Sequence, residues 1–120
     1  MKLEELRVYS HSMELSEKIW KIVEPWPKFH LDTIGKQLIR SADSIAANIS
    51  EGYGRYHFKE SKHFLFYARG SLFETKTWIM KANNRDLITD LERNQLIESF
   101  ESLGIALNNY INSIGYKRNK

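Results

Sequence analysis

Residues 40–55, Arg-Ser-Ala-Asp-Ser-Ile-Ala-Ala-Asn-Ile-Ser-Glu-Gly-Tyr-Gly-Arg, set the architecture of this chain. Apolar or small side chains recur every three or four residues, which is the spacing of one face of an α-helix. These positions are Ala42, Ile45, Ile49 and Gly52, and Leu38 continues the face one turn before the stretch. A polar edge with the same spacing consists of Ser41, Ser44, Asn48, Glu51 and Arg55. The stretch predicts an amphipathic helix whose small residues let a second helix approach closely.

The same helical periodicity recurs before and after this stretch. It predicts helices over about residues 8–24, 31–53, 57–82 and 89–115. Only short links separate them, so each helix has to run back along the one before it. The expected fold is all-α: one domain, residues 1–120, folded as an antiparallel up-down-up-down four-helix bundle.

Proline, glycine and polar residues mark the expected ends of the first two helices. Pro25 and Pro27 remove backbone donors and end the first helix. Asp32 or Thr33 can cap the start of the second helix. Gly54 can end that helix because glycine readily takes the left-handed conformation.

The fourth helix has both of its ends marked in the sequence. Thr89 and Glu92 have the spacing of a capping box, in which each side chain accepts from the other residue's backbone N–H. Gly115 ends the helix. The remaining segment, Tyr116 to Lys120, is a basic tail that we expect to fray.

Composition indicates a globular protein. The chain has 120 residues, of which 42% are hydrophobic and 12% aromatic, and it has no cysteine, which excludes disulfides and thiolate chemistry. Its N-terminus alternates charges and lacks the apolar segment of a signal peptide. No apolar run approaches the roughly 18 residues of a membrane span. We therefore expect a cytoplasmic protein without a membrane partner.

Residues 44–52, Ser-Ile-Ala-Ala-Asn-Ile-Ser-Glu-Gly, followed by Tyr53 and Arg55, resemble the signature of a bacterial protein family. Its members are small four-helix-bundle proteins encoded in intervening sequences of 23S ribosomal RNA genes. The resemblance extends to Val8-Tyr9, to the run from Ala68 to Glu74 and to the leucine-rich fourth helix. It implies a homopentamer. A related branch, the accessory protein of diversity-generating retroelements, is a basic pentamer that binds nucleic acid and a reverse transcriptase.

Polar residues of the signature form an expected structural network with the third helix. Its members are Ser44, Asn48, Glu51, Gly52 and Glu74. Asn48 and Glu51 lie at the edge of the apolar face, where we expect hydrogen bonds to Ser71 or Glu74 that fix the register of the two helices. Glu51 and Arg55 also form a favourable i, i+4 pair.

The third helix carries two further stripes, each with a seven-residue period. The basic stripe consists of Arg55, Lys62, Arg69 and Lys76. The apolar row consists of Phe66, Phe73 and Met80, on the expected outer face. Because an apolar row should not face water in a monomer, we expect it to contact another copy of the chain.

Two interpretations of the basic stripe are open. Its cations could pair with acids of a neighbouring helix or subunit, or they could hold phosphates on a symmetric surface. Flanking positions of the fourth helix offer no carboxylates, which favours phosphates: they are Ile97, Gly104, Ala106 and Ile111. The candidate nucleic-acid-binding residues are Arg55, Lys59, Lys62, Arg69 and Lys76. Neighbouring aromatic rings such as Tyr56 could stack on bases.

Catalytic and metal-binding motifs are not recognisable in the sequence. The four histidines are not paired at helical spacing, and there is no glycine-rich phosphate loop. We expect no enzyme activity, cofactor or metal. The expected function is a homo-oligomeric scaffold, a pentamer by resemblance alone, that binds nucleic acid, with RNA favoured over DNA. The alternative is a scaffold for a partner protein, such as a reverse transcriptase, without direct nucleic-acid binding.

Overall fold

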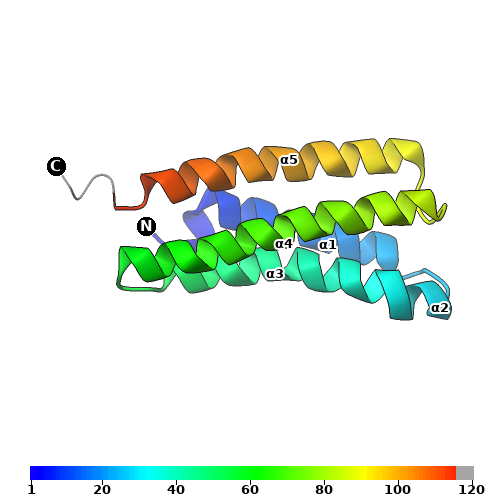
Figure 1. The fold of residues 1–120 in the computed structure, drawn as a ribbon, viewed down its shortest axis with the longest axis horizontal. Helices are drawn as coiled ribbons and strands as arrows, with labels where there is room; N and C mark the ends of the chain where they lie inside the picture. The colour runs from blue at the N-terminus through cyan, green and yellow to red at the C-terminus, as the bar shows by residue number, and fades with distance from the viewer. Residues whose placement is uncertain (116–120) are drawn as a thin grey trace.

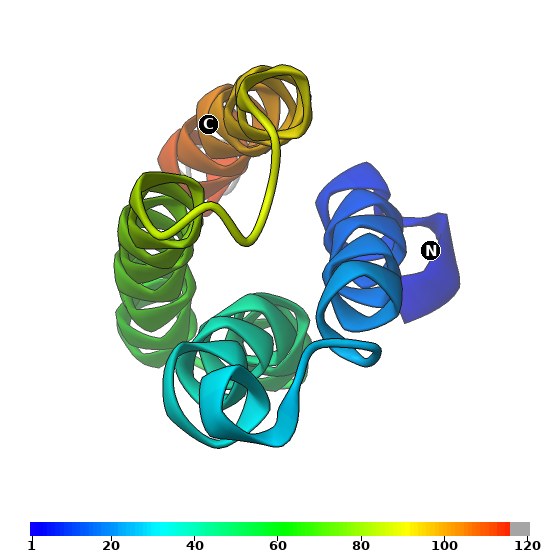
Figure 2. The same cartoon turned by 90° about the vertical axis from the view of Figure 1, so that its right-hand side faces the viewer.

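The computed structural model describes residues 1–115, and over that range the chain is an all-α bundle of four long helices. These are α1 (Arg7–Val23), α3 (Lys36–Tyr53), α4 (Phe58–Asn84) and α5 (Asp90–Ser113). A short α2 (Lys28–His30) and a π-helical turn (Leu31–Gly35) lead into α3, and a 3-10 turn (Leu3–Glu5) precedes α1. Successive long helices run in opposite directions (Figure 1) and follow one another around a common centre (Figure 2). The predicted antiparallel four-helix bundle is confirmed, and the basic tail lies outside the described residues.

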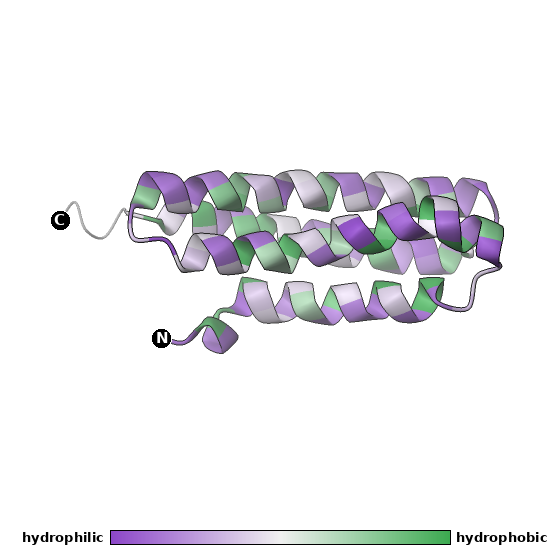
Figure 3. Ribbon diagram, turned by 90° about the horizontal axis from the view of Figure 1, so that it is seen from below, coloured by the Kyte–Doolittle hydropathy of each residue, from purple (hydrophilic) through white to green (hydrophobic). Residues whose placement is uncertain are grey.

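Side chains from all four long helices meet in one apolar core. Ile19 of α1, Ile45 of α3, Leu65 of α4 and Leu103 of α5 are completely shielded from solvent. Hydrophobic bands recur along each helix between hydrophilic ones (Figure 3). Burying one such side chain contributes about 1.5–3 kcal/mol, so the periodicity seen in the sequence also stabilises the bundle. No helix in residues 1–115 combines the length and apolar character needed to cross a membrane.

The second helix begins earlier than the sequence predicts. It starts at Lys28, directly after Pro27, so the expected start three residues later is wrong, as are the expected caps Asp32 and Thr33. Asp32 instead accepts from Lys28 Nζ at 2.8 Å, and Thr33 Oγ1 donates to the Phe29 carbonyl oxygen at 2.8 Å. Proline suits this boundary because the first N–H groups of a helix have no partner within it.

Gly52 lets α3 and α4 approach closely, as its small size predicts. A Cβ on Gly52 would lie 2.9 Å from the Ser61 carbonyl oxygen and 3.2 Å from the Leu65 side chain. The expected left-handed conformation of Gly54 is wrong, because its φ is −79°. Ser61 Oγ and the Arg55 N–H both donate to the Gly52 carbonyl oxygen, so α3 ends without a left-handed residue.

Both predicted ends of α5 are confirmed. Glu92 N–H donates to Thr89 Oγ1 at 3.1 Å and Thr89 N–H donates to Glu92 Oε1 at 2.8 Å, which is a capping box. Gly115 follows the helix with a φ of 82°, a conformation that favours glycine. A Cβ at this position would also lie 3.2 Å from the Phe58 ring.

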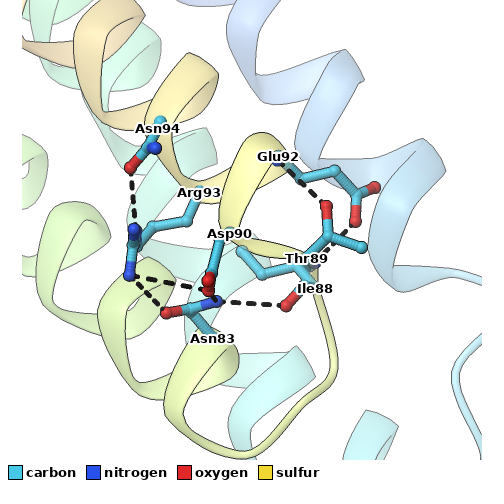
Figure 4. A network of polar contacts seen from close by, with 7 residues as sticks. All are labelled: Asn83, Ile88, Thr89, Asp90, Glu92, Arg93 and Asn94. Atoms are coloured by element: carbon cyan, nitrogen blue, oxygen red, sulfur yellow. Dashed lines mark hydrogen bonds and ion pairs between the residues drawn. The ribbon is translucent and has the colours of Figure 1, made fainter.

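A buried amide holds the turn between α4 and α5 together (Figure 4). Asn83 Nδ2 donates to the Ile88 carbonyl oxygen at 3.2 Å and to Asp90 Oδ1 at 2.9 Å. Arg93 Nη1 donates to Asn83 Oδ1 at 2.7 Å. One side chain therefore connects the end of α4, the turn and the first turn of α5.

Candidate nucleic-acid interface

Arg69 and Lys76 of the basic stripe lie on the side of α4 that faces α5. Arg69 Nη1 donates to Asn108 Oδ1 at 3.0 Å, and Lys76 Nζ lies 3.6 Å from Glu101 Oε2. The expectation that α5 offers the stripe no carboxylate is therefore wrong at Lys76. Glu101 lies outside the flanking positions considered in the sequence, but the long lysine and glutamate side chains meet across the helix interface.

Arg55 lies at the α3–α4 turn between two carboxylates. Its Nη2 is 2.8 Å from Glu51 Oε2, which confirms the expected i, i+4 pair, and its Nη1 is 3.1 Å from Glu60 Oε1. The guanidinium carbon is 4.5 Å from the centroid of the Phe64 ring. Arg55 is therefore the most heavily neutralised cation of the stripe.

Lys59 and Lys62 hold the unpaired positive charge of this region. Neither forms an ion pair with another residue within the described part of the chain. The His63 and Tyr67 rings stack beside them, with planes 16° apart and centroids 6.0 Å apart. Tyr56, in the preceding turn, is 90% exposed. The first turns of α4 thus present two free cations among accessible aromatic rings.

The α3–α4 turn also forms an open hollow of about 410 Å³. It is lined by Arg55, Tyr56, His57 and Phe58. The Tyr56 and His57 rings meet edge to face, with centroids 5.0 Å apart. Rings in this arrangement leave flat faces available to a stacking partner.

The apolar row lies on the outer face of α4, where the sequence predicts it. Phe66, Phe73 and Met80 are 43%, 59% and 43% exposed. The Arg69 guanidinium carbon is 4.9 Å from the Phe66 ring centroid, and Lys76 Nζ is 5.4 Å from that of Phe73. The row and the basic stripe are therefore adjacent, with cations packed on the rings. Contact of this row with another copy stays a prediction.

The Ser44, Asn48 and Glu74 side chains make their hydrogen bonds along their own helices. Asn48 Nδ2 donates to the Ser44 carbonyl oxygen at 2.9 Å, and Trp78 Nε1 donates to Glu74 Oε2 at 3.0 Å. The expected cross-helix bonds of Asn48 and Glu51 are not formed within residues 1–115. A short amide at a helix edge reaches a carbonyl of the preceding turn more easily than a neighbouring helix.

Hydroxyl contacts that the sequence interpretation missed join α3 to α4 instead. Thr75 Oγ1 and Ser41 Oγ are hydrogen-bonded at 3.0 Å in the core, and Ser61 Oγ donates to the Gly52 carbonyl oxygen at 2.7 Å. The sequence did hint at these contacts, because Ser61 and Thr75 occupy two positions on the otherwise apolar, buried face of α4. These contacts fix the register of the two helices.

Three of the four histidines contact aromatic rings in this structure. His30, His57 and His63 lie beside Phe29, Tyr56 and Tyr67 respectively. Over residues 1–115, no three His, Cys, Asp or Glu residues are grouped so that they could hold a metal ion. The chemistry available at the α3–α4 turn is therefore that of cations and rings, which bind phosphates and bases.

The fold and this surface define an all-α, antiparallel four-helix-bundle protein with a basic, aromatic end. The family model described as 23S rRNA-intervening sequence protein matches residues 4–109, and the chain belongs to this family. The family resemblance predicted from residues 44–52 is therefore confirmed.

The chain is similar in fold to a solved structure. It is the crystal structure of a protein with unknown function from the S23 ribosomal protein family of Bacteroides thetaiotaomicron VPI-5482. The TM-score is 0.77 at 23% sequence identity, and the match covers 87% of this chain and 97% of that chain. No curated protein sequence matches the chain.

Proposed function

We propose that this chain is a non-enzymatic, homo-oligomeric scaffold that binds nucleic acid, with RNA favoured. The observation that supports the proposal is the pair of unpaired cations, Lys59 and Lys62, beside exposed aromatic rings at the α3–α4 end. Cations bind phosphates with release of counterions, and aromatic rings stack on unpaired bases. Single-stranded RNA exposes both its phosphates and its unpaired bases, which favours RNA over duplex DNA.

The five candidate residues contribute unequally to this surface. Within residues 1–115, Lys59 and Lys62 have no acidic partner, and Arg69 is hydrogen-bonded to a neutral amide and packs on the Phe66 ring. Arg55 and Lys76 are paired with carboxylates, so their charge is already partly compensated. We infer that Lys59 and Lys62 supply most of the attraction for phosphates.

Assembly increases the effect of this modest charge. One chain has a net charge of only +3. A symmetric oligomer presents the same cations several times, so that one strand can contact more than one copy and bind more tightly than to a single copy. The exposed apolar row on α4 supports assembly, and the number five comes from the family resemblance.

Light scattering and a binding titration test the two parts of this proposal. We expect a particle mass that is a multiple of the 14.2 kDa of one chain. Labelled single-stranded RNA and duplex DNA are then titrated by fluorescence polarisation at several salt concentrations. Replacing Lys59 and Lys62 by Glu should weaken RNA binding at least tenfold. It should also reduce the slope of log affinity against log salt by about 1.4, or 0.7 for each lost phosphate contact.

The matched control carries the same charge change elsewhere. Lys21→Glu/Lys81→Glu replaces two exposed lysines that form no ion pair within the described residues. If both variants lose the same amount of RNA affinity, the binding is a non-specific charge attraction and does not depend on Lys59 and Lys62. No binding at low salt would contradict the nucleic-acid proposal and favour the partner-protein scaffold.

A further inference from the structure

A shallow groove of about 380 Å³ lies between α1 and α3. Small side chains, Ala46, Ala47 and Ser50, form its α3 side, and Tyr9 and Met13 form part of its α1 side. Such a groove, with a floor of small residues and an apolar edge, can receive bulky apolar side chains from another helix.

Two carboxylates line this groove without a cation. Glu17 and Asp43 form no ion pair with any residue of the described chain. Partial burial raises the pKa of Asp43, and the charge of Glu17 raises it further. An external cation would stabilise the Asp43 carboxylate beside this second negative charge, because a nearby opposite charge favours the ionised form.

The apolar row of α4 has the complementary properties. From Phe66 to Met80 it extends over about 21 Å of helix, and its side chains are bulky and exposed. Arg69 and Lys76 lie against its rings. The row therefore offers large apolar groups and positive charge, whereas the α1–α3 groove offers small residues and negative charge.

These two surfaces cannot meet within one chain. In Figure 2, α4 and α1 lie on opposite sides of the bundle, so the row and the groove belong to different faces. Two rows placed face to face would bring Arg69 and Lys76 against like charges, which opposes such a contact. A head-to-tail contact pairs opposite charges instead, and it leaves every copy able to bind two neighbours.

We propose that the apolar row on α4 of one copy docks into the α1–α3 groove of a second copy, with Arg69 facing Glu17 and Asp43. This contact rests on the assembly proposed above and identifies the surface that receives the row. It buries the exposed rings and provides the cation that the two carboxylates lack.

A mixing experiment with two variants tests this contact. Phe66→Ser/Phe73→Ser removes the row and keeps the groove, whereas Glu17→Lys/Asp43→Lys reverses the charge of the groove and keeps the row. Each variant alone should fail to form oligomers and should sediment as a 14.2 kDa monomer in analytical ultracentrifugation. An equimolar mixture should form a particle of twice that mass, because one intact row can still bind one intact groove.

Two control variants carry matched changes on other surfaces. Leu91→Ser/Ile105→Ser removes two side chains that are each 66% exposed on α5. Glu4→Lys/Glu98→Lys reverses two exposed acids outside the groove. Both controls should keep the wild-type mass. All four variants should keep the helical circular dichroism spectrum, since each replaced side chain is partly or largely exposed.

The outcomes separate this contact from the proposed function. If wild type assembles and Glu17→Lys/Asp43→Lys assembles equally well, the groove is not the receiving surface and only this inference fails. A mixture that stays monomeric also overturns it. If Phe66→Ser/Phe73→Ser keeps the wild-type mass but loses RNA binding, the row binds RNA and the contact is wrong. A monomeric wild type contradicts the proposed assembly together with this contact.

Discussion

Replacing Gly52 by alanine should loosen the contact between α3 and α4. The new Cβ would lie 2.9 Å from the Ser61 carbonyl oxygen, a backbone atom, and 3.2 Å from Leu65. Because a backbone atom cannot rotate away, α4 has to shift at its N-terminal end. The hydrogen bond from Ser61 Oγ to the Gly52 carbonyl oxygen would be strained by the same shift.

Two opposing effects set the size of this change. Overpacking in a close helix contact costs about 1–3 kcal/mol. Alanine in place of glycine in a helix recovers about 0.5–1 kcal/mol. The midpoints of these two ranges leave a net loss of about 1 kcal/mol of unfolding free energy for the Gly52→Ala variant. For a chain of 120 residues this lowers the melting temperature by about 4 °C.

Gly70 provides the matched control on α4. Nothing lies within 4 Å of a Cβ at this position, so Gly70→Ala should stabilise the helix by about 0.5–1 kcal/mol. Both substitutions are made in the Phe66→Ser/Phe73→Ser variant, so that melting followed by circular dichroism reports on a single chain. The reasoning is refuted if Gly52→Ala melts at or above the temperature of its parent, or if Gly70→Ala shows the same loss as Gly52→Ala.

Two further predictions concern a buried amide and a partly buried carboxylate. Asn83→Ala should lower the free energy of unfolding in urea by about 1–3 kcal/mol, because its three hydrogen-bond partners in the α4–α5 turn lose their contacts. Replacing the exposed neighbour Asn84 by alanine should cost almost nothing. Asp43→Asn, in the variant that lacks the row, should raise stability at pH 7 by less than about 1 kcal/mol. The raised pKa means that ionised Asp43 destabilises the folded chain. Below pH 3.8 the carboxyl is neutral in both the folded and the unfolded chain, so the gain in stability from Asp43→Asn should vanish there. A gain that stays constant with pH would contradict this prediction.

Much of the fold could be predicted because helix formation is local. Apolar spacing identified all four long helices, and the capping box of Thr89 and Glu92 marked the start of α5. Gly115 marked its end for an equally local reason, its positive φ. The start of α2 was missed, because Asp32 and Thr33 resemble caps although the helix already begins at Lys28, directly after Pro27.

The candidate site was only partly predictable. The seven-residue period predicted a basic stripe and an outward-facing apolar row on α4, and Phe66, Phe73 and Met80 are exposed as expected. That the stripe and the row are adjacent is seen only in the structure. The pairing of Lys76 with Glu101 was missed, and so was the groove that brings Glu17 near Asp43. The ion pair and the groove each bring together residues of two helices. The number of residues between two positions in the sequence does not give the distance between them in the fold.

Helical periodicity alone thus accounts for the number of helices, their apolar faces and the rows on α4, since each depends on neighbours within a few residues. The positions of Gly52 against Ser61 and of Asn83 against Arg93 depend on how the helices pack. Packing also sorts the cations into those compensated by acids and those left free, which is the distinction that the proposed nucleic-acid surface depends on.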